Sequence, residues 1–198
     1  VPYASSYRLD VYTGSDISDL FFSEYIEGTS YNKAIEIYNG TGATVDLGNY
    51  KLQLFSNGAS TASSTLDLSG TLANAEVYVI AHPSANANIL AEADLTSSTV
   101  INFNGDDALA LYKISANSYV DIFGRIGEDP GDYWGTPPNI TKDQTLVRKT
   151  SISSGISQNP SSGFPTLITE WDFYPVDTTT YLGSHTYGSK AISYVPGY

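Results

Sequence analysis

The sequence predicts an all-β fold, an antiparallel sandwich or barrel, from three observations. Between residues 18 and 125, short stretches recur in which apolar residues occupy every second position. Gly, Asn and Asp, which favour turns, close these stretches at spacings of about ten to twenty residues. β-branched and aromatic residues, which favour strands, are frequent within them. These features are typical of strands that bury one face.

The composition limits the class of protein. The 198 residues, 41% of them hydrophobic, suffice for one core, and no run of about 18 apolar residues offers a membrane span. A net charge of -12 disfavours nucleic-acid binding, because phosphate backbones would be repelled. The absence of Cys excludes disulfides. Because the chain starts at Val1 and contains no Met, we expect that a leader peptide was removed and that the protein is extracellular or at the cell surface.

Five stretches carry the strand pattern. It is clearest at 50–55 (YKLQLF), where Leu52 and Leu54 would face one side and Lys51 and Gln53 the other. The remaining four, in chain order, are 34–38 (AIEIY), 76–81 (EVYVIA), 108–112 (ALALY) and 119–123 (YVDIF).

Other segments are less regular. Residues 84–95 (SANANILAEADL) predict one short helix with Ser84 as its cap. Residues 127–165 hold most of the Pro residues and predict long loops around the sandwich, with one strand at 145–149 (TLVRK).

The two ends differ from the middle and divide the chain into a tail (1–17), a sandwich (18–187) and a second tail (188–198). In the first tail Tyr7, Leu9 and Val11 alternate with polar residues, and the second contains the β-prone stretch AISYV with Ile192 and Tyr194. Such tails pair either within their own domain or with a neighbour, to which they would donate a strand.

Six motifs, spread in order over residues 18–187, resemble the bacterial lamin-tail domain. They are FFSEYIEGTSYNKAIEIYNGTG, SGTLANAEVYVIAH, INFNGDDALALYK, DIFGRIGEDPGDYW, TLVRKTS and EWDFYPVDTTTYLGSHTYG. The resemblance implies an immunoglobulin-like β-sandwich of secreted bacterial proteins, often attached to extracellular nucleases or other exported enzymes as a non-catalytic module. This chain carries no nuclease domain and adds the two tails.

The motifs offer little catalytic chemistry. The two histidines, His82 and His185, lie in neither a nucleophile motif nor a metal motif, and His185 is expected to make a structural hydrogen bond. Trp134 and Trp171 are expected to pack in the core. We therefore predict that the protein is not an enzyme and needs no cofactor, with calcium as the one metal worth testing.

Calcium prefers oxygen ligands on loops, and acidic loops of an extracellular sandwich supply them. In the stretch 21–42 we expect Glu24 and Glu27 to lie on an acidic loop. Glu36, flanked by Ile35 and Ile37, is predicted to point outward from its strand. The aspartates at 106 and 107 also suit a turn ahead of a strand. The calcium candidates are Glu24, Glu27, Asp106, Asp107, Glu128, Asp129 and Asp132.

Two functions from different classes follow. In the first, the protein is a structural subunit that self-assembles by strand exchange into a filament or surface layer, with itself as partner. In the second, it is a monomeric secreted binding or adhesion module whose exposed aromatic residues dock a glycan or another surface protein. The 16 Tyr residues suit either function, because they also stabilise sheets as cross-strand pairs.

Overall fold

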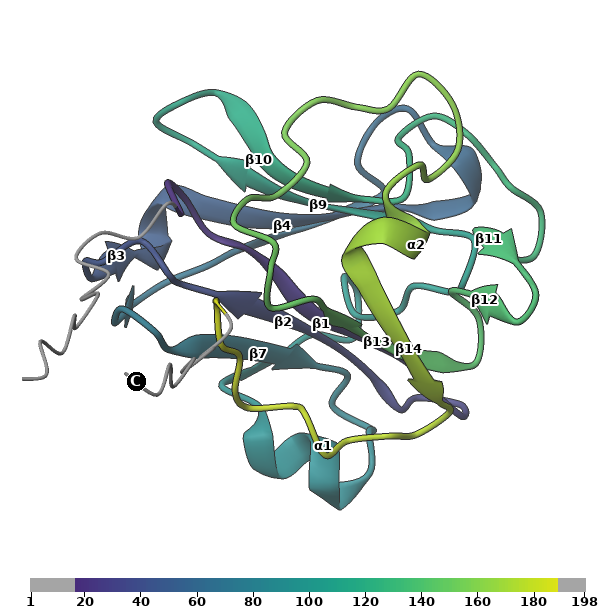
Figure 1. Ribbon diagram of the computed structural model, residues 1–198, viewed down its shortest axis with the longest axis horizontal. Coiled ribbons are helices and arrows are strands. Elements are labelled where there is room, and N and C mark those ends of the chain that lie inside the picture. Colours follow the sequence, from purple (N-terminus) through teal and green to yellow (C-terminus); the bar gives the residue numbers. More distant parts are fainter. Residues whose placement is uncertain (1–16, 189–198) are drawn as a thin grey trace, which may run out of the picture.

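The chain folds as a two-layer antiparallel β-sandwich, which confirms the predicted architecture (Figure 1). The computed structural model describes residues 17–188. One sheet has the order β14-β13-β1-β2-β7-β8 and the other β10-β9-β4-β5, and β11 with β12 and β3 with β6 form two small ribbons. The strands are β1 (Phe21–Glu27), β2 (Lys33–Tyr38), β3 (Val45–Asp46), β4 (Tyr50–Phe55), β5 (Ser64–Asp67), β6 (Thr71–Leu72), β7 (Val77–Ala81), β8 (Leu95–Thr96), β9 (Ala108–Lys113), β10 (Ser118–Phe123), β11 (Gly135–Thr136), β12 (Asn139–Ile140), β13 (Gln144–Arg148) and β14 (Trp171–Pro175).

The predicted strands are present. The alternation at 50–55 gives a strand with the same bounds, and the other four predicted stretches and the one at 145–149 match strands to within one residue at each end. Two short helices complete the fold, α1 (Ala87–Glu92) and α2 (Leu167–Glu170). The cap of α1 is Asn86 rather than the predicted Ser84, because the Asn86 side chain accepts a hydrogen bond from Ile89 N. In the part of the chain that the structure describes, no helix is long and apolar enough to cross a membrane.

The main core lies between the sheets. Tyr25 on β1 stacks on Phe123 of β10 with ring centroids 4.3 Å apart, and on Phe103, which precedes β9, at 4.9 Å. Trp134 and Trp171 are both buried in this core, as predicted. Full burial of such rings is worth about 2–3 kcal/mol each, so this cluster fixes how the sheets face each other.

A second layer covers the outer face of the six-stranded sheet. Ile26 on β1 and Val79 on β7 pack against Ile89 of α1 and against Leu182. The C-terminal part of the described chain, yellow in Figure 1, leaves β14, passes α1 and turns back toward β2. Strands β1 and β2 are consequently buried along their whole length, on both faces.

The first and last described residues meet at one end of the molecule. Ile17 packs with Phe21 and Tyr38 in a small cluster, which we call the terminal cluster, and Tyr187 packs against it. Ile17 is only 2% exposed, so it belongs to the sandwich rather than to the tail 1–17 in which the sequence pattern placed it. The predicted donor residues Tyr7, Leu9, Val11, Ile192 and Tyr194 lie outside the described residues.

Candidate functional site

Glu24 is the most unusual of the predicted calcium ligands. It lies in the middle of β1 rather than on a loop and is 1% exposed, and neither carboxylate oxygen has a hydrogen-bond partner among residues 17–188. Burial, with a smaller contribution from the nearby Glu36, raises the pKa of Glu24 to about 9. At neutral pH the side chain is therefore a neutral carboxylic acid, which is a poor ligand for a cation.

Glu36 faces Glu24 across the β1–β2 pair. It was predicted to point outward into solvent, and this is wrong: it is 1% exposed, because the C-terminal segment covers it. Its Oε1 accepts a hydrogen bond from Ser23 Oγ at 2.6 Å and its Oε2 accepts one from Gly183 N at 2.7 Å. Burial raises the pKa of Glu36 to about 7, and these hydrogen bonds limit the rise.

Glu27, at the end of β1, is paired. Its Oε1 lies 2.8 Å from Lys33 Nζ, and both side chains are less than 10% exposed. Lys33 Nζ also donates to Phe103 O at 2.6 Å and to Asn104 Oδ1 at 3.2 Å, while Glu27 Oε2 accepts from Asp143 N. The prediction that Glu27 lies on a loop is wrong, and its charge is already compensated by a buried ammonium group.

Asp107 stabilises two turns, as its place in the NGDD turn suggested. Its carboxylate accepts hydrogen bonds from Asn57 N at 2.8 Å and from Asn104 N at 2.7 Å. Burial raises the pKa of Asp107, and the two backbone N–H groups oppose that rise. Asp106 lies beside it in the same turn and is half-buried.

The third acidic loop is also structural in its contacts. Glu128 Oε2 lies 2.9 Å from Arg125 Nη1 and accepts from Gly163 N, and Asp129 accepts from Gly131 N. Asp132 is exposed. Within residues 17–188, no three His, Asp or Glu side chains gather in a group able to hold a metal. Calcium binding by these residues therefore stays a prediction without geometric support.

Neither histidine has a partner for nucleophilic catalysis in the described chain. His82 Nδ1 accepts from the backbone N–H of Ser84, and its ring stacks on Tyr31 at 4.4 Å. Within residues 17–188, His185 Nε2 is buried without a hydrogen-bond partner, so the expected structural bond is not formed at that atom. The His185 ring instead packs edge-on against Phe21 and Tyr38 of the terminal cluster.

Sequence reasoning missed a buried ion cluster between the sheets. Arg148 on β13 contacts Asp121 on β10 at 2.8 Å and Glu170 at 2.6 Å. Its guanidinium group also lies 5.0 Å from the Trp171 ring centroid. These residues are far apart in the sequence, and the only available signal was a basic residue inside the predicted strand 145–149.

A pocket of about 510 Å³ opens close to where the described chain begins. Asp19, Tyr50 and Lys113 form its ionic side, with Asp19 accepting from Tyr50 Oη at 2.6 Å and from Lys113 Nζ at 2.7 Å. The hydrogen bond to Asp19 adds to burial and raises the pKa of Tyr50 to about 12. These three groups satisfy one another, and Asp46, which also lines the pocket, accepts a hydrogen bond from Gly48 N.

The edges of the sheets differ in how they are covered. At β10, Ile156 N donates to Asp121 Oδ1 at 2.7 Å, so residues 154–156 run along that edge. At β5, the last strand of the same sheet, the described residues include no further strand. Leu66 of β5 packs against the main core while remaining partly exposed. Within the described residues the sheet therefore ends at β5, with a partly exposed apolar side chain at that edge.

Comparisons with known proteins agree with the motifs. The family model described as Lamin Tail Domain matches residues 13–127, which is more than half of the chain. Searches of curated proteins and of solved structures gave no match. The matched region contains β1 to β10, and with them the buried glutamates and the β5 edge. The chain therefore belongs to the lamin tail domain family, and its all-β sandwich is the immunoglobulin-like fold of that family.

Proposed function

We propose that this protein is an extracellular structural subunit that self-assembles by adding a terminal strand of one copy to the β5 edge of the next. The family is a non-catalytic immunoglobulin-like module, which supports a structural role over an enzymatic one. The observation that carries the proposal is the β5 edge, where backbone groups and the half-buried Leu66 lie at the end of a sheet. A donated strand would complete both the hydrogen bonding and the apolar packing.

The places where the described chain begins and ends support the same proposal. Ile17 lies in the terminal cluster and Tyr187 packs against it, so both ends of the described chain lie at one end of the sandwich. Sixteen extended residues span at most about 55 Å, which exceeds the diameter of a small domain and so reaches a neighbouring copy. A head-to-tail arrangement of this kind does not close on itself and generates a filament.

Peptide complementation tests the proposal. A chain shortened to residues 17–198 keeps Ile17 and should bind a synthetic peptide of residues 1–16 saturably. A matched peptide with Leu9→Lys and Val11→Lys should not bind, because the donated apolar side chains are replaced by charges. Absence of binding by the unmodified peptide to a folded 17–198 chain contradicts donation by the first tail, and the same assay with residues 189–198 tests the second.

Edge variants locate the acceptor strand. Leu66→Asp places a charge where the donated strand would pack, and it should abolish peptide binding and assembly. Thr65→Asp, one residue away on the exposed face of β5, is the matched control and should retain both. Equal effects of the two substitutions would move the acceptor site away from β5.

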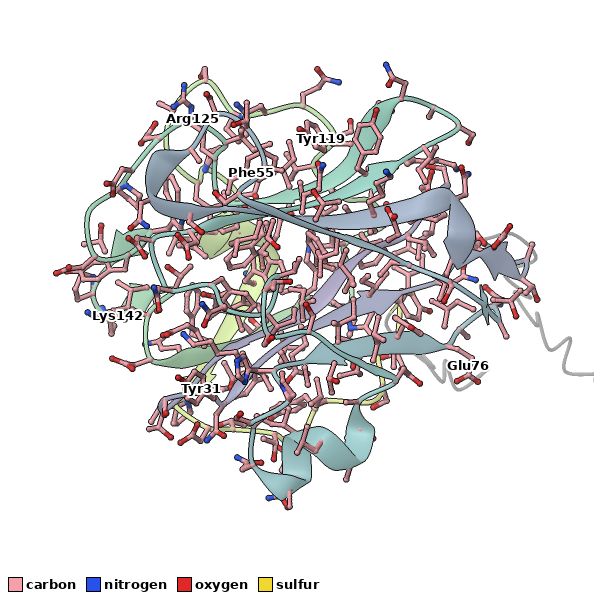
Figure 2. All side chains as sticks on the ribbon, turned by 180° about the vertical axis from the view of Figure 1, so that it is seen from behind. Tyr31, Phe55, Glu76, Tyr119, Arg125 and Lys142 are labelled. Carbon is pink, nitrogen blue, oxygen red and sulfur yellow. The ribbon has the colours of Figure 1, made fainter. Side chains whose placement is uncertain are left out.

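A second candidate function rests on the exposed aromatic ring of Tyr31. Tyr31 is 50% exposed in the turn between β1 and β2, with one ring face stacked on His82 (Figure 2). The free face suits a sugar ring or an apolar side chain, as a monomeric binding or adhesion module requires. A glycan array with the wild-type protein and Tyr31→Ala tests this candidate: only ligands that the variant loses support it.

A further inference from the structure

The buried side chains of Lys33 and Glu27 meet the side chain of the exposed Asn104. Lys33 and Glu27 are register partners at the turn end of the β1–β2 pair, and Asn104 precedes β9 in the opposite sheet. Lys33 Nζ lies 2.8 Å from Glu27 Oε1 and 3.2 Å from Asn104 Oδ1. An amine, a carboxyl group and a carboxamide thus meet at one point between the two sheets.

We propose that Lys33 and Asn104 become joined by an intramolecular isopeptide bond, with Glu27 as the proton-transfer group. The reaction needs a nucleophilic amine held against an amide carbonyl, and the fold supplies this proximity without a second molecule. The side-chain oxygen Oδ1 of Asn104 already accepts a hydrogen bond from Lys33 Nζ. The carboxamide carbon Cγ is therefore adjacent to the attacking nitrogen. Glu27 lies within the reach that general acid–base catalysis requires.

The surroundings keep Lys33 and Glu27 out of contact with bulk solvent. Lys33 is 5% exposed and Glu27 6%, and a proton moved from Nζ to Oε1 replaces a buried ion pair by an uncharged amine and acid. Phe103, which is fully buried, and Tyr25 stack beside the amine and limit access of water. The carbonyl oxygen of Phe103 accepts from Nζ at 2.6 Å and holds the amine in place.

The reaction is balanced with groups of this chain alone. Glu27 takes a proton from Lys33 Nζ, and the neutral nitrogen forms a bond to Asn104 Cγ. The Cγ–Nδ2 bond then breaks as Glu27 returns that proton to Nδ2, while the former Nζ loses its second proton to become the amide N–H. Ammonia departs and takes up this second proton, so the products are a secondary amide and an ammonium ion. Asn104 is exposed and its Nδ2 makes no hydrogen bond to the described residues, so the leaving group has a route to solvent.

The product would join β2 of one sheet to the segment that precedes β9 of the other. The chain contains no Cys, so no disulfide can make such a link. Lys113 provides a comparison within the same molecule: its Nζ lies 2.7 Å from the Asp19 carboxylate and 5.4 Å from the Tyr50 ring centroid, but it contacts no side-chain amide. Lys113 therefore has the carboxylate and the aromatic ring but, among the described residues, no carboxamide whose ammonia could leave.

Mass spectrometry of the full chain tests the proposal directly. Loss of ammonia lowers the intact mass by about 17 Da relative to the sequence. Proteolysis should leave Lys33 uncleaved by trypsin and yield one branched peptide that contains both Lys33 and Asn104. Lys33→Arg and Glu27→Gln should each restore the full sequence mass, whereas Lys113→Arg, the matched control, should keep the deficit.

Cyclisation of an Asn-Gly pair to a succinimide loses the same mass, and the chain has three such pairs: Asn39-Gly40, Asn57-Gly58 and Asn104-Gly105. Hydroxylamine cleaves a succinimide but leaves the branched peptide intact. A full sequence mass for the wild type, or a deficit that persists in Lys33→Arg, overturns the proposal. If a variant fails to fold, the wild-type peptide map decides alone, because the branched peptide is either present or absent.

Discussion

Two glutamates of the same strand, Glu24 and Glu27, are both almost completely buried but in opposite electrostatic situations. Glu27 pairs with Lys33 and accepts a hydrogen bond from Asp143 N, and its charge is compensated. Glu24 has no hydrogen-bond partner among residues 17–188, and the residue opposite it on β2 is another carboxylate, Glu36. The comparison teaches that burial alone does not decide what a carboxyl group does: its partners decide whether it stays ionised or becomes neutral.

The two situations also mark two parts of the domain. The paired Glu27 lies where the β1–β2 turn meets the opposite sheet. The unpaired Glu24 lies beside Glu36, which holds the C-terminal segment through Gly183 N. The stability of the region where β1 and β2 meet the C-terminal segment is therefore expected to depend on pH.

The largest effect is expected from Glu24→Gln, which should change how the unfolding free energy depends on pH. The folded-state pKa of about 9 lies above the ordinary 4.5, so the stabilising contribution of the neutral acid is complete below pH 4.5 and is lost as pH rises to 9. The Gln side chain cannot ionise. Relative to pH 4.5, the unfolding free energy of the variant should therefore rise above that of the wild type by about 3 kcal/mol at pH 7 and by about 6 kcal/mol at pH 9. Chemical denaturation of both proteins at pH 5, 7 and 9 measures it, and a constant difference would contradict a neutral Glu24.

Replacement of the paired glutamate should have the opposite sign. Glu27→Leu leaves the Lys33 ammonium group buried without its carboxylate, and the unfolding free energy should fall by about 3–5 kcal/mol at pH 7. Urea unfolding of the variant beside the wild type provides the value. A neutral or stabilising result would show that the two glutamates are equivalent.

A smaller effect is expected on the acidic side, from His185 in the terminal cluster. Burial, with a lesser contribution from Arg148, lowers the pKa of His185 to about 4, below its ordinary 6.5. Its contribution to stability is therefore complete above pH 6.5 and is lost as pH falls toward 4. His185→Phe should gain about 2 kcal/mol over the wild type at pH 5 relative to pH 7. Thermal unfolding at both pH values would detect this gain, and its absence would place the charged imidazole in solvent.

The smallest effect belongs to an exposed ion pair, which sets the scale for the buried ones. Lys51 Nζ lies 3.3 Å from Asp67, and the side chains are 34% and 76% exposed. Lys51→Ala should change the unfolding free energy by less than about 1 kcal/mol. If the unfolding free energy fell as much as in Glu27→Leu, burial would not determine how much an ion pair contributes to stability.

Local sequence patterns predicted the strands that bury one face. The alternation YKLQLF gave β4 with its observed bounds, because Lys51 and Gln53 remain partly exposed while Leu52 and Leu54 are buried. In β1 all seven residues are buried, so FFSEYIE does not alternate, and its glutamates were taken for a loop. Strands covered on both faces lose the period-two signal.

The buried acidic site could not be found for a related reason. The alternation around Glu36 is regular, and a sheet face that is open to solvent would have placed its carboxylate outside. What covers that face, Leu182 and Gly183, comes almost 150 residues later in the chain, and nothing local to Glu36 reveals the contact. The family motifs, by contrast, predicted the fold from their order alone.

Electron microscopy of negatively stained intact protein, with light scattering, tests the proposed assembly most directly. We expect regular filaments at neutral pH that persist with a calcium chelator, since no metal cluster is found in the described residues. The chain of residues 17–188, which lacks both tails, should remain folded and monomeric under the same conditions. A monodisperse monomer of the intact protein, with and without chelator, would contradict self-assembly and leave the binding module.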